Sequence, residues 1–222
     1  SIFGVQEGIL SQIKYIDNSF EKYSYIGVGR DDGQKKGEFC AIFYNTNFYE
    51  IDQQSTFWLS NTPGIVSVGW DASMERICTY GLFKSKISEE KFWVFNTHFD
   101  HIGDNARKES AKLILEKIKN INKSDLPVIL MGDFNSEPND EPIKILEKFM
   151  IDGLKISLKK LQGPTGTFNG FDVRSSMDKR IDYIFTKSFK VHSYRHIDDR
   201  LENNKHISDH LPVLVKVKGI FP

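Results

Sequence analysis

The sequence predicts an α/β protein in which two β-sheets form the centre and helices lie outside them. Aromatic and β-branched runs alternate with polar, turn-forming clusters, a pattern typical of strands. Two segments instead show the apolar spacing of amphipathic helices. The 222 residues contain no repeat, low-complexity tract or linker, and this length supports one substantial core. We therefore expect residues 1–222 to form a single domain.

The first half predicts strands around one short helix. "IFGVQE" (2–7) is a short buried strand, and the spacing of Ile9, Leu10, Ile13 and Ile16 predicts a helix after it. Three further stretches are rich in aromatic and β-branched residues and are separated by polar clusters. They predict consecutive antiparallel strands within 38–60, 76–83 and 90–100.

The second half begins with the clearest amphipathic helix, at 105–121, where alanine, isoleucine and leucine form one stripe. "LPVILMG" (126–132) is a continuous apolar run, typical of a central strand buried on both faces. Asp140 and Pro142 mark the start of a helix over 140–150. A glycine-rich loop at 163–172 precedes the closing strands, which we expect at 180–186, 189–197 and 211–217.

The composition fits an ordinary soluble globular protein. Hydrophobic residues make up 39% and charged residues 27%, and the apolar runs are too short for a membrane span, so we expect no transmembrane segment. Thirty basic residues balance thirty acidic ones, and the charge therefore gives no sign of a long polyanionic partner. Residues 1–100 carry 9 basic and 13 acidic side chains, so the remainder has a weak positive excess.

Cys40 and Cys78 both fall in strand-like runs, where a buried free thiol is the main interpretation and a disulfide the alternative. The sequence starts within a strand and without an initiator Met, so a targeting segment would lie ahead of it. The cytoplasm, the periplasm and secretion all stay open as its location. We expect a monomer.

Polar side chains recur at the ends of five predicted strands. They are Glu7, Asn96 to Asp100, Asp133 with Asn135, Asp182, and Asp209 with His210. Each alone has an ordinary explanation: "GDFN" is most often a turn, Glu7 a solvated strand end, His98 a core histidine, and "SDH" a turn or helix cap.

If these strand ends converge, four carboxylates share one rim, those of Glu7, Asp133, Asp182 and Asp209. They repel one another unless a cation or paired histidines neutralise them. Oxygen ligands without a histidine and cysteine cluster favour Mg²⁺ or Mn²⁺ over zinc. The sequence therefore predicts a magnesium or manganese site.

The ordered motifs "VQE", "NTH", "GDFN", "RIDYIF" and "SDHLPV" resemble the endonuclease/exonuclease/phosphatase superfamily, which has a DNase-like fold. The resemblance runs from Glu7 to the last strand. "YIGVGRDDG", "GEFCAIFY", "FWLS" and "NTHFDHIG" are similar to a bacterial branch of metal-dependent hydrolases. The resemblance implies a four-layer α/β sandwich with two mixed sheets packed face to face. It also implies metal-assisted, in-line attack of water on a phosphate ester.

The resemblance also implies a role for each motif residue. Glu7 would be the principal metal ligand, and Asp209 would contribute directly or through water. Asp133 would orient or deprotonate the attacking water, and Asn135 would hold a phosphate oxygen.

The two histidines would act on the reacting phosphate. His210 would contact the phosphate or the nucleophile while Asp182 fixes its tautomer. His98 would stabilise the developing charge or protonate the leaving oxygen.

Two residues are further candidates for binding the substrate. Arg76, at the head of a strand, is a candidate phosphate contact, although a surface arginine fits the position equally well. Asn169 reaches the same rim or merely serves its glycine-rich loop. Asp100 and His101 form a second polar group, for which a loop before the following helix is an equally good explanation.

One feature departs from the resemblance. Family members begin with an earlier strand that ends in an asparagine beside the metal, and the sequence starts at the second strand. We therefore expect one more strand ahead of residue 1.

The substrate stays open at this point. A phosphodiester, possibly within a nucleic acid, is the leading hypothesis, and a small-molecule or lipid-headgroup phosphate ester is the first alternative. A non-catalytic interaction module of the same fold is the second. The basic residues of two loops are candidate phosphate contacts or ordinary solvated charges: Arg30, Lys35, Lys36, Arg174 and Lys179.

Overall fold

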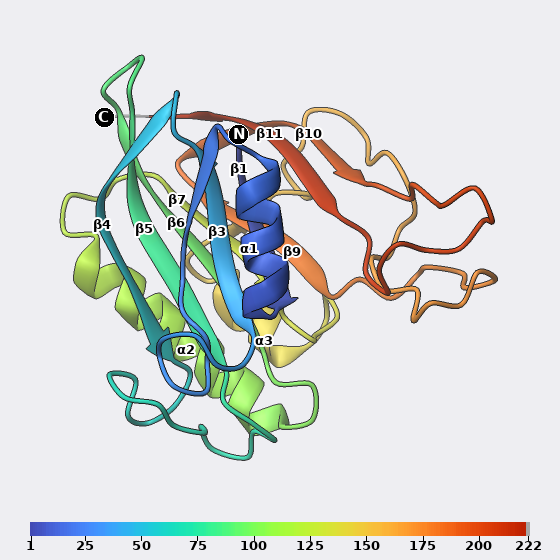
Figure 1. Cartoon of the computed structure of the whole chain (residues 1–222), viewed down its shortest axis with the longest axis horizontal. Coiled ribbons are helices and arrows are strands. Elements are labelled where there is room, and N and C mark those ends of the chain that lie inside the picture. Colours follow the sequence, from blue (N-terminus) through green and yellow to red (C-terminus); the bar gives the residue numbers. More distant parts are fainter. Residues whose placement is uncertain (221–222) are drawn as a thin grey trace.

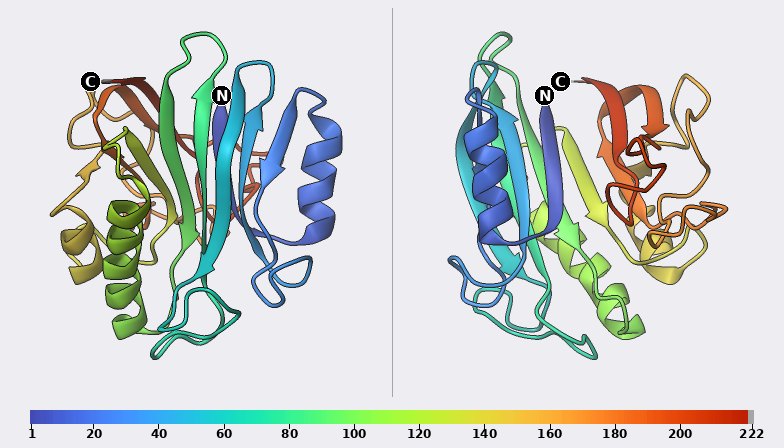
Figure 2. Two further views of the ribbon diagram at one scale, coloured as in Figure 1. Left: turned by 90° about the vertical axis from the view of Figure 1, so that its left-hand side faces the viewer. Right: turned by 45° about the vertical axis from the view of Figure 1, so that its right-hand side comes forward.

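The chain folds into four layers in the order helix, sheet, sheet and helices (Figures 1 and 2). The computed structural model describes residues 1–220. Helix α1 (Leu10–Ser19) forms one outer layer, and α2 (Asp104–Ile121) and α3 (Glu141–Leu146) form the other. This arrangement confirms the α/β sandwich that the sequence predicts.

A six-stranded mixed sheet forms one inner layer. Its strands are, in spatial order, β4 (Tyr49–Trp58), β5 (Ile77–Ser85), β6 (Lys91–His98), β7 (Val128–Asp133), β9 (Asp182–Lys187) and β8 (Ile151–Asp152). Only β6 and β7 pair in parallel, and helix α2 connects them. The apolar run at 126–132 thus forms a central strand, as predicted.

Two smaller sheets make up the other inner layer. Strands β1 (Ile2–Gly8), β3 (Phe39–Asn45) and β2 (Tyr23–Ile26) form one in the order β1-β3-β2. Strands β10 (Phe189–His196) and β11 (Val213–Gly219) form an antiparallel ribbon. Both smaller sheets pack on the same face of the six-stranded sheet, because Ile42 of β3 and Tyr194 of β10 belong to one core cluster with it.

Each interface between layers has its own apolar core. Helix α1 covers the small sheet through Ile13, which packs with Phe43 of β3. The two sheet layers meet at a second cluster. Helices α2 and α3 cover the large sheet through a third, in which Ile114 and Ile143 pack with residues such as Phe134. The amphipathic stripe of 105–121 therefore faces the large sheet, as its spacing predicts.

The strands within 38–60 differ from the prediction. Strands β4, β5 and β6 are consecutive and antiparallel, but β3 does not pair with β4 and lies in the other sheet. Residues 39–43 are buried on both faces, which suits a strand between α1 and the large sheet, whereas the middle of β4 is exposed. The connection at 46–48 therefore crosses between layers. Strands β2 and β8 were not predicted, and α3 ends at Leu146, short of residue 150.

A groove separates β1 from β11. Its cavity of about 920 Å³ is lined by both strands, and Phe92, Ile129 and Met131 of the large sheet contribute to the same lining. Among residues 1–220, no strand pairs with the edge of β1 or of β11 that faces away from its sheet partner. The groove therefore presents two free strand edges, one of β1 and one of β11.

Cys40 and Cys78 are both buried and free, which confirms the main interpretation of the two thiols. Burial raises the pKa of Cys40 to about 12, so this thiol stays protonated at neutral pH. Separately, no helix within residues 1–220 has the length and apolar character needed to cross a membrane.

Candidate active site

The register of the large sheet brings three of the predicted site residues to one rim. His98 at the end of β6 lies opposite Asp133 at the end of β7, and Asp133 lies opposite Asp182 at the start of β9. All three are at most 8% exposed. Because the parallel pair β6 and β7 ends at this rim and the antiparallel β9 starts there, the side chains share one end of the sheet.

Glu7 reaches the same rim from the other sheet layer. Its Oε1 lies 3.9 Å from Nε2 of His98. The fully buried Asn96 of β6 helps to set this placement, because its Nδ2 donates to the carbonyls of Val5 and Ala41 across the sheet interface. Glu7 has φ 60°, a left-handed conformation that costs free energy in a non-glycine residue and recurs at functional sites.

The "GDFN" segment forms the end of β7 and has unusual backbone conformations at the rim. Gly132 has φ 148°, and a Cβ atom there would lie 2.0 Å from the carbonyl oxygen of Thr97. Only glycine lets β7 approach β6 this closely. Asn135 has φ 44°, which asparagine tolerates better than most residues. The motif is therefore the end of β7 followed by a bend, and the turn that was its ordinary explanation is wrong.

Asn135 connects the ends of β6 and β7. Its Nδ2 lies 3.1 Å from Nε2 of His98, and it donates to the carbonyl of Phe99 at 3.0 Å. Its backbone N–H donates to Oδ1 of Asp133 at 2.8 Å. Nε2 of His98 also lies 3.2 Å from Oδ2 of Asp133. The carboxylate, the amide and the imidazole thus form one hydrogen-bonded group.

His210 completes the rim beside Asp182. Its Nδ1 lies 2.8 Å from Oδ2 of Asp182, and its Nε2 lies 3.9 Å from Oδ2 of Asp133. The ring of Phe168 meets the imidazole edge-on, and the hydroxyl of Thr167 accepts the backbone N–H of Asp182. Since an ionised carboxylate only accepts hydrogen bonds, Nδ1 of His210 carries a proton and Nε2 faces the centre of the group.

Burial and neighbouring charges at the rim shift the pKa values of Asp133, Asp182 and His210. Burial raises the pKa of Asp133, but the hydrogen bond and charge of His98 outweigh this and leave that pKa below its ordinary value. Burial raises the pKa of Asp182 above its ordinary value. Burial lowers the pKa of His210, whereas its hydrogen bond to Asp182 and the carboxylate charges raise it more, to about 9.

The raised pKa of His210 predicts a pH dependence of stability in metal-free protein. A raised folded-state pKa stabilises the fold fully below the unfolded value of 6.5, and this contribution is lost as the pH rises through about 9. In EDTA, we expect the free energy of unfolding to fall more steeply between about pH 7 and 10 for the native protein than for Asp182→Asn. Urea unfolding across this range measures both slopes, and equal slopes would contradict the assignment.

Two groups of side chains have the donor atoms and spacing for a metal ion. Glu7, His98 and Asp133 form one, and Asp133, Asp182 and His210 form the other, with ligand atoms within 4.8 Å of one another. Asp209 is in neither group, and the hydroxyl of Ser208 is its side-chain neighbour. Glu7 therefore shares a candidate metal group with Asp133, whereas the other predicted ligand, Asp209, belongs to neither group.

Asn169 and Arg76, the two further candidates for binding the substrate, are both buried. Asn169 is 3% exposed, its Nδ2 donates to the carbonyl of Ser208, and its Oδ1 accepts the N–H of Phe171. The backbone N–H of Asn169 also donates to the carbonyl of Asp209. Through these hydrogen bonds, Asn169 connects its glycine-rich loop to the segment that carries His210. Arg76 is 4% exposed and pairs with Asp100.

Asn96 is one of the polar strand-end residues in the sequence but has no predicted role there, and Thr167 is not among the predicted site residues. Asn96 fixes β1 against β6, and Thr167 caps the start of β9 by accepting the N–H groups of Ile181 and Asp182. Their signals were weak, because a buried asparagine within a strand and a threonine in a loop are both common. Only the folded structure shows which backbone groups they reach.

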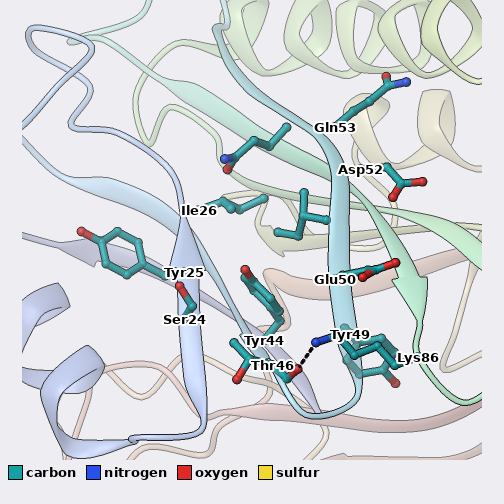
Figure 3. A pocket seen from close by; sticks show the side chains of 12 residues that line it. Ser24, Tyr25, Ile26, Tyr44, Thr46, Tyr49, Glu50, Asp52, Gln53 and Lys86 are labelled. Atoms are coloured by element: carbon teal, nitrogen blue, oxygen red, sulfur yellow. Dashed lines mark hydrogen bonds between the residues drawn. The ribbon is translucent and has the colours of Figure 1, made fainter.

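The hollow drawn in Figure 3 lies apart from this rim. It has a volume of about 480 Å³ between β2 and β4, and Tyr25, Tyr44 and Tyr49 are among its lining residues. Lys86 donates to the carbonyl of Thr46 there. The lining includes none of the predicted site residues, whereas the groove between β1 and β11 extends to Asp182 and His210.

Known proteins similar to this chain match over most of its length. A sequence model described as the endonuclease/exonuclease/phosphatase family matches residues 1–210. The solved mannosyl-6-phosphatase Bt3783 of Bacteroides thetaiotaomicron is 41% identical, with a TM-score of 0.93 over 98% of this chain and 85% of that one.

Two further relatives are an endonuclease/exonuclease/phosphatase family protein and a viral protein. The first, a solved structure from the same bacterium, is 42% identical, with a TM-score of 0.92 over 97% of this chain and 82% of that one. The second, an uncharacterized protein of Acanthamoeba polyphaga mimivirus, is 31% identical over 87% of this chain and 73% of its own length.

Proposed function

Because the chain belongs to the endonuclease/exonuclease/phosphatase family, whose members hydrolyse phosphate esters, we propose that it is a phosphoesterase that requires Mg²⁺ or Mn²⁺. One observation supports the proposal most: Glu7, His98, Asp133, Asp182 and His210 from four strand ends and a loop gather at one rim. A stability role alone does not explain why so many charged groups share one partly buried place.

The donor set at the rim suits a hard divalent cation. Glu7 and Asp133 offer carboxylate oxygens, and neither of the two cysteines belongs to the groups at the rim. We assign Glu7 as the principal ligand, with Asp209 contributing directly or through water. Such an ion supplies positive charge for the phosphate oxygens during hydrolysis.

Asp133 and Asn135 have the positions to act on water and phosphate. Asp133 is ionised at neutral pH, because its pKa lies below the ordinary value, and it therefore accepts a proton or a hydrogen bond from a water molecule. Asn135 keeps its amide between the two strand ends and donates toward a phosphate oxygen.

His210 and His98 supply donors from two sides of Asp133. Asp182 holds Nδ1 of His210, so Nε2 is directed toward Asp133. When the ring is protonated, Nε2 donates a hydrogen bond to the phosphate. Nε2 of His98 lies between Glu7 and Asp133, where it can stabilise the negative charge that develops on the leaving oxygen.

A small phosphate ester is the substrate class that we favour. The mannosyl-6-phosphatase relative is 41% identical, and the net charge of zero lacks the basic excess that supports binding to long nucleic acids. A nuclease-like phosphodiesterase is the second candidate, because exposed basic residues such as Lys35, Lys36, Arg174 and Lys179 occur in two loops. A non-catalytic module is less well supported, since every carboxylate and both histidines of the motifs are present.

A substrate panel tests the proposal. With Mg²⁺ or Mn²⁺ we expect phosphate release from a hexose 6-phosphate or phenyl phosphate to exceed cleavage of bis(p-nitrophenyl) phosphate and single-stranded DNA. Faster cleavage of the diesters would favour the nuclease-like candidate. Absence of hydrolysis from the whole panel, with lipid headgroups, abasic DNA and RNA added, would favour the non-catalytic module.

A further inference from the structure

A second polar cluster lies beside the rim and has no part in the function proposed above. It consists of Ser73, Arg76, Asp100 and His101. Asp100 is 1% exposed and accepts hydrogen bonds from the backbone N–H groups of Ser73, Ile102 and Gly103, as well as from the Ser73 hydroxyl. Burial raises its pKa, but these donors outweigh burial and hold the pKa well below its ordinary value. Asp100 is therefore a fixed negative charge.

Arg76 connects this charge to His101. Its Nε lies 3.4 Å from Oδ1 of Asp100, and its Nη2 lies 2.8 Å from Nδ1 of His101. A guanidinium group only donates hydrogen bonds, so Nδ1 of His101 is the acceptor. The proton of the neutral imidazole is therefore on Nε2. Asp100 and Arg76 thus fix one tautomer of His101 and the orientation of its ring.

The position of His101 is next to the candidate active site. His101 follows His98 by three residues, and Arg76 directly precedes β5, which pairs with β6 on the side away from β7. The hydroxyl of Thr97 donates to the carbonyl of Ile77 across this pair. Along the rim, the cluster therefore lies beyond His98 on the side opposite Asp133 and Asp182.

His101 also differs from the other rim imidazoles in its exposure. Its side chain is 48% exposed, against 7% for His98 and 20% for His210. An exposed imidazole with a fixed N–H is a donor without an acceptor among residues 1–220. Arg76 makes its side-chain hydrogen bonds to Asp100 and His101, so a buried guanidinium holds one exposed ring, and this suggests a ligand that offers oxygen acceptors.

We propose that His101 is a substrate-binding residue that donates from Nε2 to an oxygen of the alcohol portion of the ester, with Arg76 and Asp100 as positioning residues. This inference rests on the proposed phosphoesterase activity and narrows its substrate to oxygen-rich alcohols such as sugars. The acceptor lies on the far side of His98, where the leaving alcohol must be if His98 stabilises the leaving oxygen. His101 takes no part in bond making or breaking.

The test compares two phosphomonoesters that differ in the alcohol, mannose 6-phosphate and phenyl phosphate. For His101→Ala, loss of one hydrogen bond should raise KM for mannose 6-phosphate about 5- to 20-fold, with kcat changed less than about 3-fold. Phenyl phosphate offers no hydroxyl oxygens, so its KM and kcat should be unchanged. His101→Gln keeps an N–H donor and should recover part of the loss. His192→Ala, at an exposed histidine of β10, is the matched control.

The outcomes separate this inference from the proposed function. Equal effects of His101→Ala on both substrates, no effect on either, or native protein that hydrolyses only phenyl phosphate would overturn the role of His101 and leave the phosphoesterase intact. Native protein inactive on both monoesters would overturn the inference. If the diesters are then not hydrolysed either, the proposed function fails with it. Circular dichroism and thermal unfolding of each variant identify a general loss of fold.

Discussion

Asp182→Asn is expected to lower kcat about 10²- to 10⁴-fold while KM for the phosphate ester changes little. Asp182 is buried, and its carboxylate holds Nδ1 of His210 at 2.8 Å. An asparagine amide can present its NH₂ group to Nδ1 instead, so the neutral ring carries its one hydrogen on Nε2 and donates it without the positive charge of the protonated ring. It also removes the charge that raises the pKa of His210, so fewer molecules carry the protonated ring at neutral pH.

Steady-state kinetics across pH measure this effect, with Asp178→Asn as the control. Asp178 lies in the loop before β9 and is exposed, so its substitution changes charge in the same segment without touching the pair. If turnover of Asp182→Asn matched the native protein at every pH, Asp182 would not act through His210.

Glu7→Gln is expected to raise the Mg²⁺ concentration needed for half-maximal activity about 10- to 100-fold or more, while turnover at saturating metal falls less. The side chain of Glu7 is 57% exposed and its backbone is strained, so packing does not account for a carboxylate at this position. The amide has the same size but no charge, and a neutral oxygen is a poorer ligand for Mg²⁺.

Titration calorimetry with Mg²⁺ and metal titration of activity give independent measures of this change. Glu89→Gln is a closely matched control, because Glu89 is also an exposed glutamate, with φ 61°, and it pairs with Lys84 away from the rim. Unchanged metal affinity in Glu7→Gln would remove Glu7 from the metal site and leave Asp133 as its best candidate.

The strand ends at the site could be predicted from the sequence because burial and polarity change abruptly there. "VILMGD" and "FWVFNTH" are apolar runs that finish in polar or charged residues. The sequence alone shows such a change at the end of a strand. Their convergence follows from the parallel pairing of β6 and β7, which places His98 opposite Asp133. Pairing between distant segments has no local signature in the sequence.

The division of strands between the sheets was harder to predict. β3 and β4 are neighbours in sequence and both are rich in β-formers, which predicts a hairpin. The structure separates them, because Phe39 to Phe43 of β3 are buried on both faces whereas β4 is an edge strand. The role of Asn96 had the same difficulty, since its hydrogen-bond partners Val5 and Ala41 are more than 50 residues away in sequence.

The account depends most on the claim that the rim is a metal-dependent catalytic centre. Its most direct test is the rate of phosphate-ester hydrolysis by the same preparation in Mg²⁺, in EDTA, and in Mg²⁺ with His210→Ala. We predict hydrolysis in the first condition, a return of the rate after EDTA when Mg²⁺ is added back, and a loss of about 10²-fold or more in the variant. Equal rates in all three conditions would contradict the account.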